Sequence, residues 1–286
     1  MKKILITGSN GQLGSELKDL LKSTDSFTAV FLDRDNLDLA NTHSIQPTLS
    51  AYNPDIIIHA AAYTAVDKAE SEADLADKIN HLASAEIASY CKEHDCKLVA
   101  ISTDYVFDGN SSTALNEEAA VDPINVYGRT KLLGEQAIQN ILPEAIIIRT
   151  SWVYSTYGNN FVKTMIRLMS EREEISVIND QVGSPTYAKD LAKVILTIIN
   201  SEQWISGIYH YSNEGEISWF DFAEEIKRIK GLVCKINAIP TSSYPTPAKR
   251  PKYSLLDKGK IIKNYGVVVP NWKDSLQEMI NLLKKN

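Results

Sequence analysis

The feature that most constrains this chain lies at its start, where a short apolar run leads directly into three glycines in three-residue steps. The run is Ile4–Thr7, and the glycines are Gly8, Gly11 and Gly14. Glycine lets the backbone turn tightly and approach a pyrophosphate, while the unpaired N–H groups of a following helix favour an anion. The pattern therefore predicts a dinucleotide-binding turn at the end of a first strand.

Short apolar runs alternate with longer amphipathic ones through the first half of the chain. Strands are expected at Ile4–Thr7, Ala29–Leu32, Ile56–His59, Leu98–Ser102 and Ile146–Arg149. Helices with apolar positions three or four residues apart are expected at Gln12–Leu21, Leu75–Glu93 and Val126–Ile141. Continuous apolar strands suit a sheet that is covered on both faces. The pattern predicts an α/β fold, a Rossmann-type doubly wound parallel sheet that binds ligands at the carboxyl ends of its strands.

The alternation changes after about Thr150, where aromatic and small residues become common and proline-containing turns interrupt the chain. We interpret residues 1–150 as a dinucleotide-binding domain and residues 151–286 mainly as a smaller C-terminal substrate-binding lobe. No sharp linker separates them, so we expect the chain to cross between the lobes more than once.

Composition excludes several classes of protein. A formal net charge of -6 and a pI near 5.5 argue against a nucleic-acid partner. The cysteines Cys91, Cys96 and Cys234 are too few and too irregularly spaced for a disulfide framework or a zinc site. The N-terminus enters a strand and a glycine turn too soon for a signal peptide, and no segment approaches a membrane-spanning length. We expect a cytoplasmic protein with no membrane partner.

A tyrosine and a lysine four residues apart, Tyr127 and Lys131, give the second chemical signal. On one face of a helix, the ammonium favours the phenolate and would lower the tyrosine pKa toward neutrality. Asp122 and Pro123 suggest an N-cap and a first turn just upstream. Thr103, at the end of a buried strand, could bond the carbonyl oxygen that Tyr127 protonates. Together these residues predict proton delivery during carbonyl reduction.

The adenosine end of a dinucleotide would meet Asp33 and Arg34, about twenty residues past the glycine turn. Asp33 could accept bonds from the ribose hydroxyls, whereas Arg34 could pair with a 2′-phosphate. A solvated turn is the alternative for both, and more so for Arg34. The two residues make opposite demands, so either NADH or NADPH could be the cofactor.

Three further residues have more than one interpretation. Asp104 could cap a turn or bond a substrate hydroxyl. Trp152, just past the fifth strand, could pack on a sugar face or fill the interface between the lobes. His59 ends an apolar strand with no evident partner, which favours a core or cofactor-lining residue over an acid or base.

Several longer strings resemble one known family. They are Gly8-x-x-Gly11-x-x-Gly14, Ala60–Glu70, Ser102–Phe107, Asn125–Gly128 with Lys131, Arg149–Tyr154 and Tyr244–Pro247. The first and the Tyr127/Lys131 pair resemble the extended short-chain dehydrogenase/reductase superfamily. The whole set, from the first strand to about Pro251, resembles its dTDP-4-dehydrorhamnose reductase branch.

The resemblance implies reduction of the C4 ketone of dTDP-4-dehydro-L-rhamnose by NADPH or NADH, which supplies a sugar donor for cell-surface polysaccharide. By position it assigns cofactor binding to Gly11, Gln12, Leu13, Asp33, Asp38, Leu39, Ala62, Tyr63 and Thr64. It also makes Tyr127 the proton donor, Lys131 its ribose-binding partner, and Thr103, Asp104 and Trp152 the sugar contacts.

One position departs from the family pattern. Some members form dimers around Mg²⁺ through glutamates, one early in the first helix and one in the helix after a Gly-x-Pro-Thr turn. Glu16 fits the first position, but Lys189 stands at the second, and a charged lysine cannot ligate Mg²⁺. We therefore expect no metal site, with Glu16 an exposed first-turn acid, and a monomer or a metal-independent dimer.

Two other functions compete with the reductase. An epimerase or dehydratase for nucleotide sugars would keep and recycle its cofactor, but Thr103-Asp104-Tyr105 lacks the glutamate expected beside a dehydratase's Thr-Asp pair. A non-catalytic, NADP-binding regulatory subunit could share the fold, since fold alone does not fix function. The intact Tyr127/Lys131 pair favours catalysis.

Overall fold

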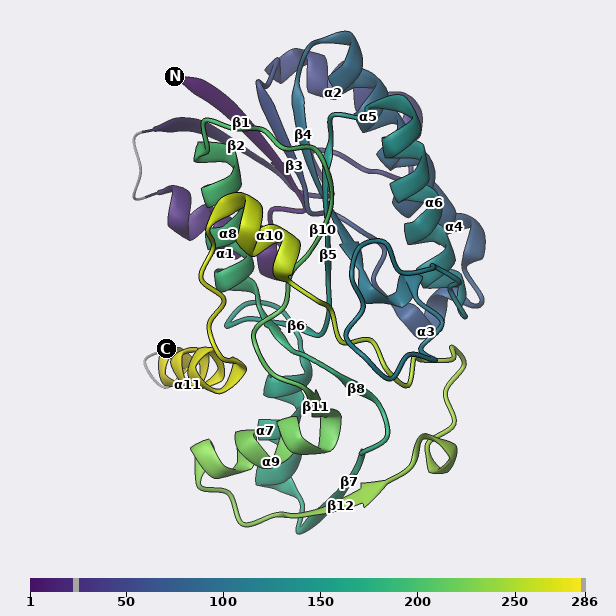
Figure 1. Ribbon diagram of the computed structural model, residues 1–286, viewed down its shortest axis with the longest axis vertical. Helices are drawn as coiled ribbons and strands as arrows, with labels where there is room; N and C mark the ends of the chain where they lie inside the picture. The colour runs from purple at the N-terminus through teal and green to yellow at the C-terminus, as the bar shows by residue number, and fades with distance from the viewer. Residues whose placement is uncertain (23–25, 284–286) are drawn as a thin grey trace.

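A six-stranded parallel sheet forms the centre of the protein, of which the computed structural model describes residues 1–22 and 26–283 (Figure 1). The strand order is β10-β5-β4-β3-β1-β2, and every neighbouring pair is parallel. The strands are β1 (Lys2–Thr7), β2 (Phe27–Leu32), β3 (Ile56–His59), β4 (Lys97–Thr103), β5 (Ile146–Thr150) and β10 (Gly207–His210). The predicted doubly wound sheet is confirmed.

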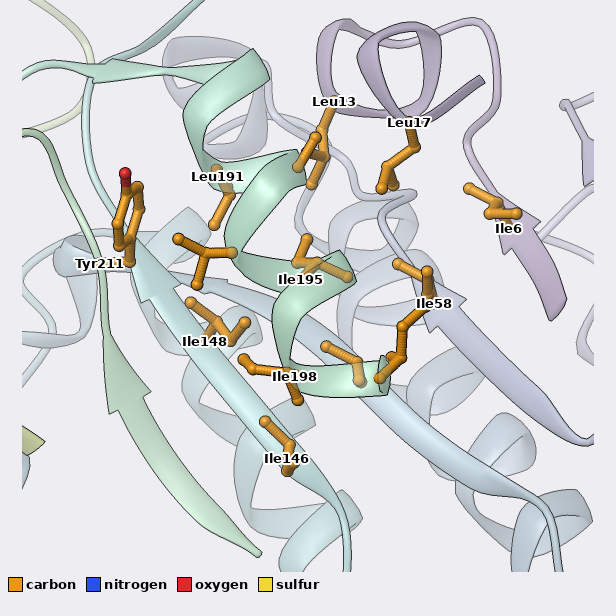
Figure 2. Packing of buried hydrophobic residues seen from close by; sticks show 14 of the residues in the cluster. Ile6, Leu13, Leu17, Ile58, Ile146, Ile148, Leu191, Ile195, Ile198 and Tyr211 are labelled. Carbon is orange, nitrogen blue, oxygen red and sulfur yellow. The ribbon is translucent and has the colours of Figure 1, made fainter. Parts of the chain in front are cut away.

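Helices cover both faces of this sheet, which explains the continuous apolar strands. One face is covered by α1 (Gln12–Leu21), α8 (Ala188–Asn200) and α10 (Gly259–Tyr265). The other is covered by α2 (Ile45–Tyr52), α5 (Ala83–Glu93) and α6 (Val126–Ile141). Figure 2 shows α8 on the first face, where Ile195 and Ile198 pack against strand residues such as Ile58 and Ile146.

A smaller lobe lies beyond the carboxyl ends of the strands (Figure 1). Its helices are α7 (Phe161–Glu171), α9 (Trp219–Lys230) and α11 (Trp272–Leu283). Three strand pairs join them: β6 (Val153–Tyr154) with β9 (Thr186–Tyr187), β7 (Glu174–Ile178) with β12 (Lys235–Ile239), and β8 (Val182–Gly183) with β11 (Ile217–Ser218). Phe222, Trp272 and Met279 belong to a separate core beneath these elements.

The chain crosses between the sheet layers and the smaller lobe more than once. Strand β10 and helices α8 and α10 all follow residue 150, yet they pack in the sheet layers. A division into two domains at residue 150 stays a prediction, and β10, which follows residue 150, completes the central sheet.

The predicted helix over Leu75–Glu93 is wrong in its middle. The helical segment comprises α4 (Ala73–Asp77), a π-helical turn (Lys78–Leu82) and α5. The π turn adds a residue and redirects Asn80, which bonds the backbone of Tyr63 at both N–H and C=O (2.8 and 3.1 Å). Hydrophobic periodicity does not reveal such a turn. Short helices complete the chain at Thr42–Ser44, Val66–Ala69, Asp104–Val106 and Thr241–Ser243.

The predicted range of α6 is confirmed, but its predicted cap is wrong. The N-cap is Asn125, whose side chain accepts a bond from Gly128 N–H at 2.7 Å, so Asp122 and Pro123 lie in the preceding loop. Glu70 accepts from the Val126 N–H at 2.9 Å and satisfies a second donor. The Asn125 cap is local and sets the helix start, whereas Glu70, which is distant in sequence, only adds to it.

None of the helices within residues 1–22 and 26–283 is long and apolar enough to cross a membrane. Cys91, Cys96 and Cys234 are buried free thiols.

Candidate active site

A cleft of about 830 Å³ opens at the carboxyl ends of the sheet strands, between the sheet and the smaller lobe. It includes the point between β1 and β3 where the strand order reverses, the usual ligand position in such sheets. The predicted site residues that line it are Gly8, Gly11, Gln12, Leu13, Asp33, Arg34, Asp38, Leu39, Ala62, Tyr63, Thr64, Thr103, Asp104, Tyr127, Lys131 and Trp152. The structure thus brings together residues from distant parts of the sequence, and their individual roles stay predictions.

The glycine turn forms the floor of this cleft. Gly8 has a φ of +69°, and a Cβ there would come within 2.8 Å of the Ala61 backbone. Gly14, which does not line the cleft, packs beneath it, since a Cβ there would lie 2.3 Å from the Gly8 oxygen. Gly11 is the N-cap of α1 and offers no capping side chain, and the first turn contains no acid. The free N–H groups at the cleft fit an anion such as a pyrophosphate.

Asp33 and Arg34 follow β2 directly, beside the glycine turn. Asp33 accepts bonds from the backbone N–H groups of Asp35 and Asn36 and, at 2.8 Å, from the side chain of Asn10. Its carboxylate is therefore fixed beside the glycine turn. The Arg34 side chain is 79% exposed and lies 3.9 Å from Asp38, which leaves it free to reorient.

Tyr127, Thr103 and Lys131 all line the cleft. A hydrogen bond joins the side chains of Tyr127 and Thr103. Thr103 Oγ1 donates a further hydrogen bond to Asp104 at 3.1 Å. Lys131 Nζ donates to the Ile101 carbonyl at 2.8 Å. Phenol, hydroxyl and ammonium thus come from α6 and the end of β4, as the sequence predicted.

The predicted pKa of Tyr127 is wrong. Burial raises it to about 12, and the Thr103 hydrogen bond only partly opposes this. The expected lowering toward neutrality assumed an ammonium acting directly on the phenol, but Lys131 is bonded to a backbone carbonyl and its own pKa falls to about 8 through burial. At neutral pH Tyr127 therefore carries its proton, which suits a proton donor.

A buried ion pair lies behind Lys131. Arg149 donates to both carboxylate oxygens of Glu135, with a shortest distance of 2.7 Å, and both side chains are at most 3% exposed. Glu135 is one helical turn after Lys131, and its charge opposes the effect of burial on the Lys131 pKa. His210 and the Phe107 ring cover the Arg149 guanidinium.

Asp104 is buried and bonded on both oxygens. One accepts from Thr103 and the other from Ser254 at 2.6 Å. Thr103, not Asp104, caps the following short helix. Burial raises the pKa of Asp104 to about 6. Its contacts anchor a C-terminal segment to the end of β4, while the residue still lines the cleft.

Trp152 lines the cleft with an unusual backbone. Its φ is +48°, a left-handed conformation that a bulky residue rarely adopts. Its ring stacks on Trp219, with centroids 3.8 Å apart and planes at 15°.

His59 is a core residue. Its ring contacts Thr7 and Ser84, and burial lowers its pKa to about 3, so it stays neutral. Sequence reasoning missed Asn80, Ser254, Asn159 and Leu191. Asn80 and Ser254 act through residues distant in sequence, and Asn159 and Leu191 line the cleft without a recognisable motif.

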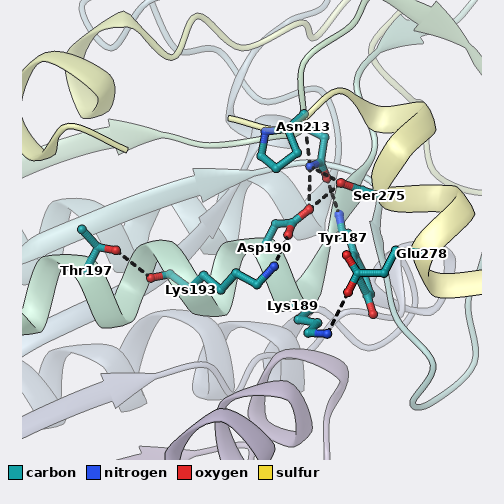
Figure 3. Close-up of polar contacts among 9 residues, drawn as sticks. Tyr187, Lys189, Asp190, Lys193, Thr197, Asn213, Ser275 and Glu278 are labelled. Carbon is teal, nitrogen blue, oxygen red and sulfur yellow. Dashed lines mark hydrogen bonds and ion pairs between the residues drawn. The ribbon is translucent and has the colours of Figure 1, made fainter. Parts of the chain in front are cut away.

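The expectation for Glu16 is wrong. Glu16 is only 4% exposed and accepts a bond from Ser155 at 2.6 Å, and burial raises its pKa. Ser155 is distant in sequence, so the first helix alone could not reveal this. Lys189 pairs with Glu278 on α11 at 2.7 Å (Figure 3), and its charge also acts on Glu16. Within the described ranges, no three acidic, histidine or cysteine residues are grouped to hold a metal ion.

The parallel sheet, the glycine turn and the Tyr-x-x-x-Lys pair define an extended short-chain dehydrogenase/reductase fold. MoeE5, solved with UDP-glucuronic acid and NAD, shares this fold at 17% identity and a TM-score of 0.81. The chain itself belongs to the RmlD substrate binding domain family, whose model matches residues 1–285. This confirms the predicted resemblance.

Relatives of this chain match it over nearly their full length. The dTDP-4-dehydrorhamnose reductase of Escherichia coli K12 is 42% identical and covers 98% of this chain, which covers 97% of it. A crystal structure of the Clostridium acetobutylicum dTDP-4-dehydrorhamnose reductase has a TM-score of 0.94 at 41% identity, with 99% of each chain covered. That of the Bacillus anthracis enzyme, in complex with NADP, has a TM-score of 0.93 at 40% identity, covering 98% of this chain and 99% of that one.

Proposed function

We propose that this protein is an NAD(P)H-dependent dTDP-4-dehydrorhamnose reductase, which reduces the C4 ketone of dTDP-4-dehydro-L-rhamnose to give dTDP-L-rhamnose. The observation that carries this is that Tyr127, Thr103 and Lys131 line one cleft together with the glycine turn. The family membership and the names of the relatives support the same reaction.

The glycine turn and Lys131 would hold the dinucleotide. The N–H groups of α1 suit the pyrophosphate, Asp33 and Arg34 lie where the adenosine ribose would sit, and Lys131 would bond the nicotinamide ribose. When bound, NADPH or NADH supplies the hydride that reaches the carbonyl carbon.

Tyr127 supplies the proton. Its phenol is protonated at neutral pH, so it can donate to the carbonyl oxygen as negative charge develops there, and it regains a proton from solvent afterwards. Thr103 offers a hydroxyl beside Tyr127 that orients the same oxygen. Asp104 and Trp152 would contact the sugar. The reaction is thereby accelerated by positioning and by general-acid catalysis.

A steady-state assay with dTDP-4-dehydro-L-rhamnose tests this proposal, with NADPH and NADH in parallel. We expect one cofactor oxidised for each sugar reduced. An epimerase or dehydratase would convert a sugar nucleotide without net cofactor oxidation, and a regulatory subunit would bind the cofactor without turnover. Either result would contradict the reductase.

We further propose a cytoplasmic enzyme whose product serves cell-surface polysaccharide, acting as a monomer or as a dimer that needs no metal. The Lys189–Glu278 ion pair supports the second part, since the Lys189 ammonium bonds Glu278 and its charge also acts on Glu16.

A further inference from the structure

From the geometry of the smaller lobe, we infer that Trp219 is a positioning residue that fixes the Trp152 indole at the sugar end of the cleft. This inference rests on the proposed function, because it assigns Trp152 to the sugar. Trp219 does not line the cleft itself, so it would act through its neighbour.

The backbone of Trp152 needs external support. A φ of +48° brings the Cβ of an L-residue too close to its own carbonyl, and strain of this kind persists only where surrounding contacts determine it. Without such contacts, the segment after β5 would relax and carry the indole away from its present place.

The contacts that fix the indole come from one two-stranded ladder. Strands β8 and β11 pair Gly183 with Ile217, and Trp219 follows β11 directly. Trp219 covers one face of the Trp152 indole, and Gly183 lies against its ring edge, where an added Cβ would come within 3.2 Å of Cζ2. The ladder therefore holds Trp219 and Gly183, which contact the face and the edge of the indole, at a fixed separation. The rest of the indole surface is left for a ligand.

Trp219 is itself rigidly held. It is the first residue of α9, whose N-cap Ser218 forms a reciprocal capping box with Asp221. Phe161 packs on it with centroids 4.6 Å apart. The support thus extends from the core of the smaller lobe to the cleft, through Phe161 and Trp219 to Trp152.

The chemistry of the cleft gives this arrangement its purpose. Trp152 shares the cleft with Thr103, Asp104 and Tyr127, the residues proposed above to contact the sugar or its carbonyl oxygen. An indole held in one orientation presents an apolar face to the C–H surface of a sugar ring and limits where C4 can lie. A mobile indole would give weaker sugar binding with little effect on the dinucleotide.

The test uses the full-length protein with Trp219→Ala, Trp219→Phe and, as a matched loss of a remote tryptophan, Trp204→Phe. We expect Trp219→Ala to weaken binding of dTDP-L-rhamnose about 3- to 10-fold and to raise KM for the keto sugar similarly. The Kd for NADPH should not change. Phe should restore most of the affinity, because it can still stack, and Trp204→Phe should match the wild type.

Two further readouts separate positioning from general damage. The stacked Trp152–Trp219 pair should give an exciton couplet in circular dichroism, which Trp219→Ala abolishes and Trp204→Phe retains. Gly183→Ala, which presses on the indole edge, should weaken sugar binding without removing Trp219. Unchanged dTDP-L-rhamnose affinity in Trp219→Ala, with the couplet lost, would overturn the inference.

Equilibrium binding also keeps this result distinct from the proposed function. If the wild type binds dTDP-L-rhamnose but does not oxidise NADPH with the keto sugar, the reductase proposal fails and the binding comparison still tests Trp219. If the wild type binds no dTDP-L-rhamnose, the inference fails together with the proposed substrate.

Discussion

The Ser254 hydroxyl donates a 2.6 Å hydrogen bond to the carboxylate of Asp104, joining two residues 150 positions apart. Ser254 is fixed in turn by its N–H bond to the Val182 carbonyl in β8. The segment that contains Ser254, strand β8 of the smaller lobe and the end of β4 therefore meet at the buried carboxyl group of Asp104. This contact keeps the cleft residues of β4 in register with the lobe that carries Trp152.

Burial of Asp104 should make stability depend on pH. Its pKa is raised from 3.8 to about 6, so the folded chain binds more protons than the unfolded chain between these values. The free energy of unfolding then falls as pH rises from about 4 to about 6, by up to about 3 kcal/mol. Asp104→Asn should remove this dependence.

Urea unfolding of the wild type and of Asp104→Asn at about pH 4 and about pH 7 measures this effect. The free energy of unfolding of the variant minus that of the wild type should be more positive at the higher pH than at the lower one. Asp74→Asn, a change at an exposed carboxylate, is the control. Equal differences at the two pH values would show that Asp104 does not titrate in this range.

Lys131→Met should separate function from stability. We expect at least about 10²-fold lower turnover and weaker cofactor binding, since the ammonium would bond the nicotinamide ribose and so both hold the cofactor and place it for hydride transfer. The unfolding midpoint at neutral pH should not fall, because burial already lowers the Lys131 pKa to about 8 and methionine needs no charge compensation. A change in only one of kcat and cofactor Kd would disprove the double role.

How much the sequence could predict depends on the range of the contacts involved. The glycine turn and the limits of α6 rest on neighbouring residues, so local patterns were enough. The cap at Asn125 is also local, but Asp122-Pro123 was the stronger signal. The burial of Glu16 depends on Ser155, which lies 139 positions away, and no local pattern indicates it.

The same limit applies within the site. Motifs identified Tyr127, Thr103 and Trp152, but not their electrostatic or steric surroundings. The raised pKa of Tyr127 follows from tertiary burial, and the stack of Trp152 on Trp219 joins two lobe segments. The sequence therefore predicted which side chains gather, whereas the structure was needed to show what fixes them.

Arg34→Ala tests the choice of cofactor. The wild type should use both NADH and NADPH without a large preference, because Asp33 suits a ribose hydroxyl and Arg34 suits a 2′-phosphate. The variant should bind NADPH roughly tenfold more weakly and NADH equally well, as titration of each cofactor would show. Arg167→Ala, at an exposed arginine on α7, is the control. An equal loss for both cofactors would mean that Arg34 does not contact the phosphate.

Removal of divalent metal should have no effect. Lys189 pairs with Glu278 (Figure 3). Its charge also acts on buried Glu16, so the ammonium repels Mg²⁺ from both acids. We expect unchanged activity and unchanged sedimentation after EDTA treatment. A dimer that EDTA dissociates, and whose activity returns with Mg²⁺, would contradict this and place the metal ligands elsewhere.

The kcat of Tyr127→Phe with dTDP-4-dehydro-L-rhamnose and NADPH tests the central claim most directly. The variant keeps the ring and loses only the hydroxyl that is hydrogen-bonded to Thr103. If Tyr127 delivers the proton, kcat should fall by at least about 10²-fold while the Kd for NADPH stays near the wild-type value. Turnover close to that of the wild type would remove Tyr127 from the mechanism.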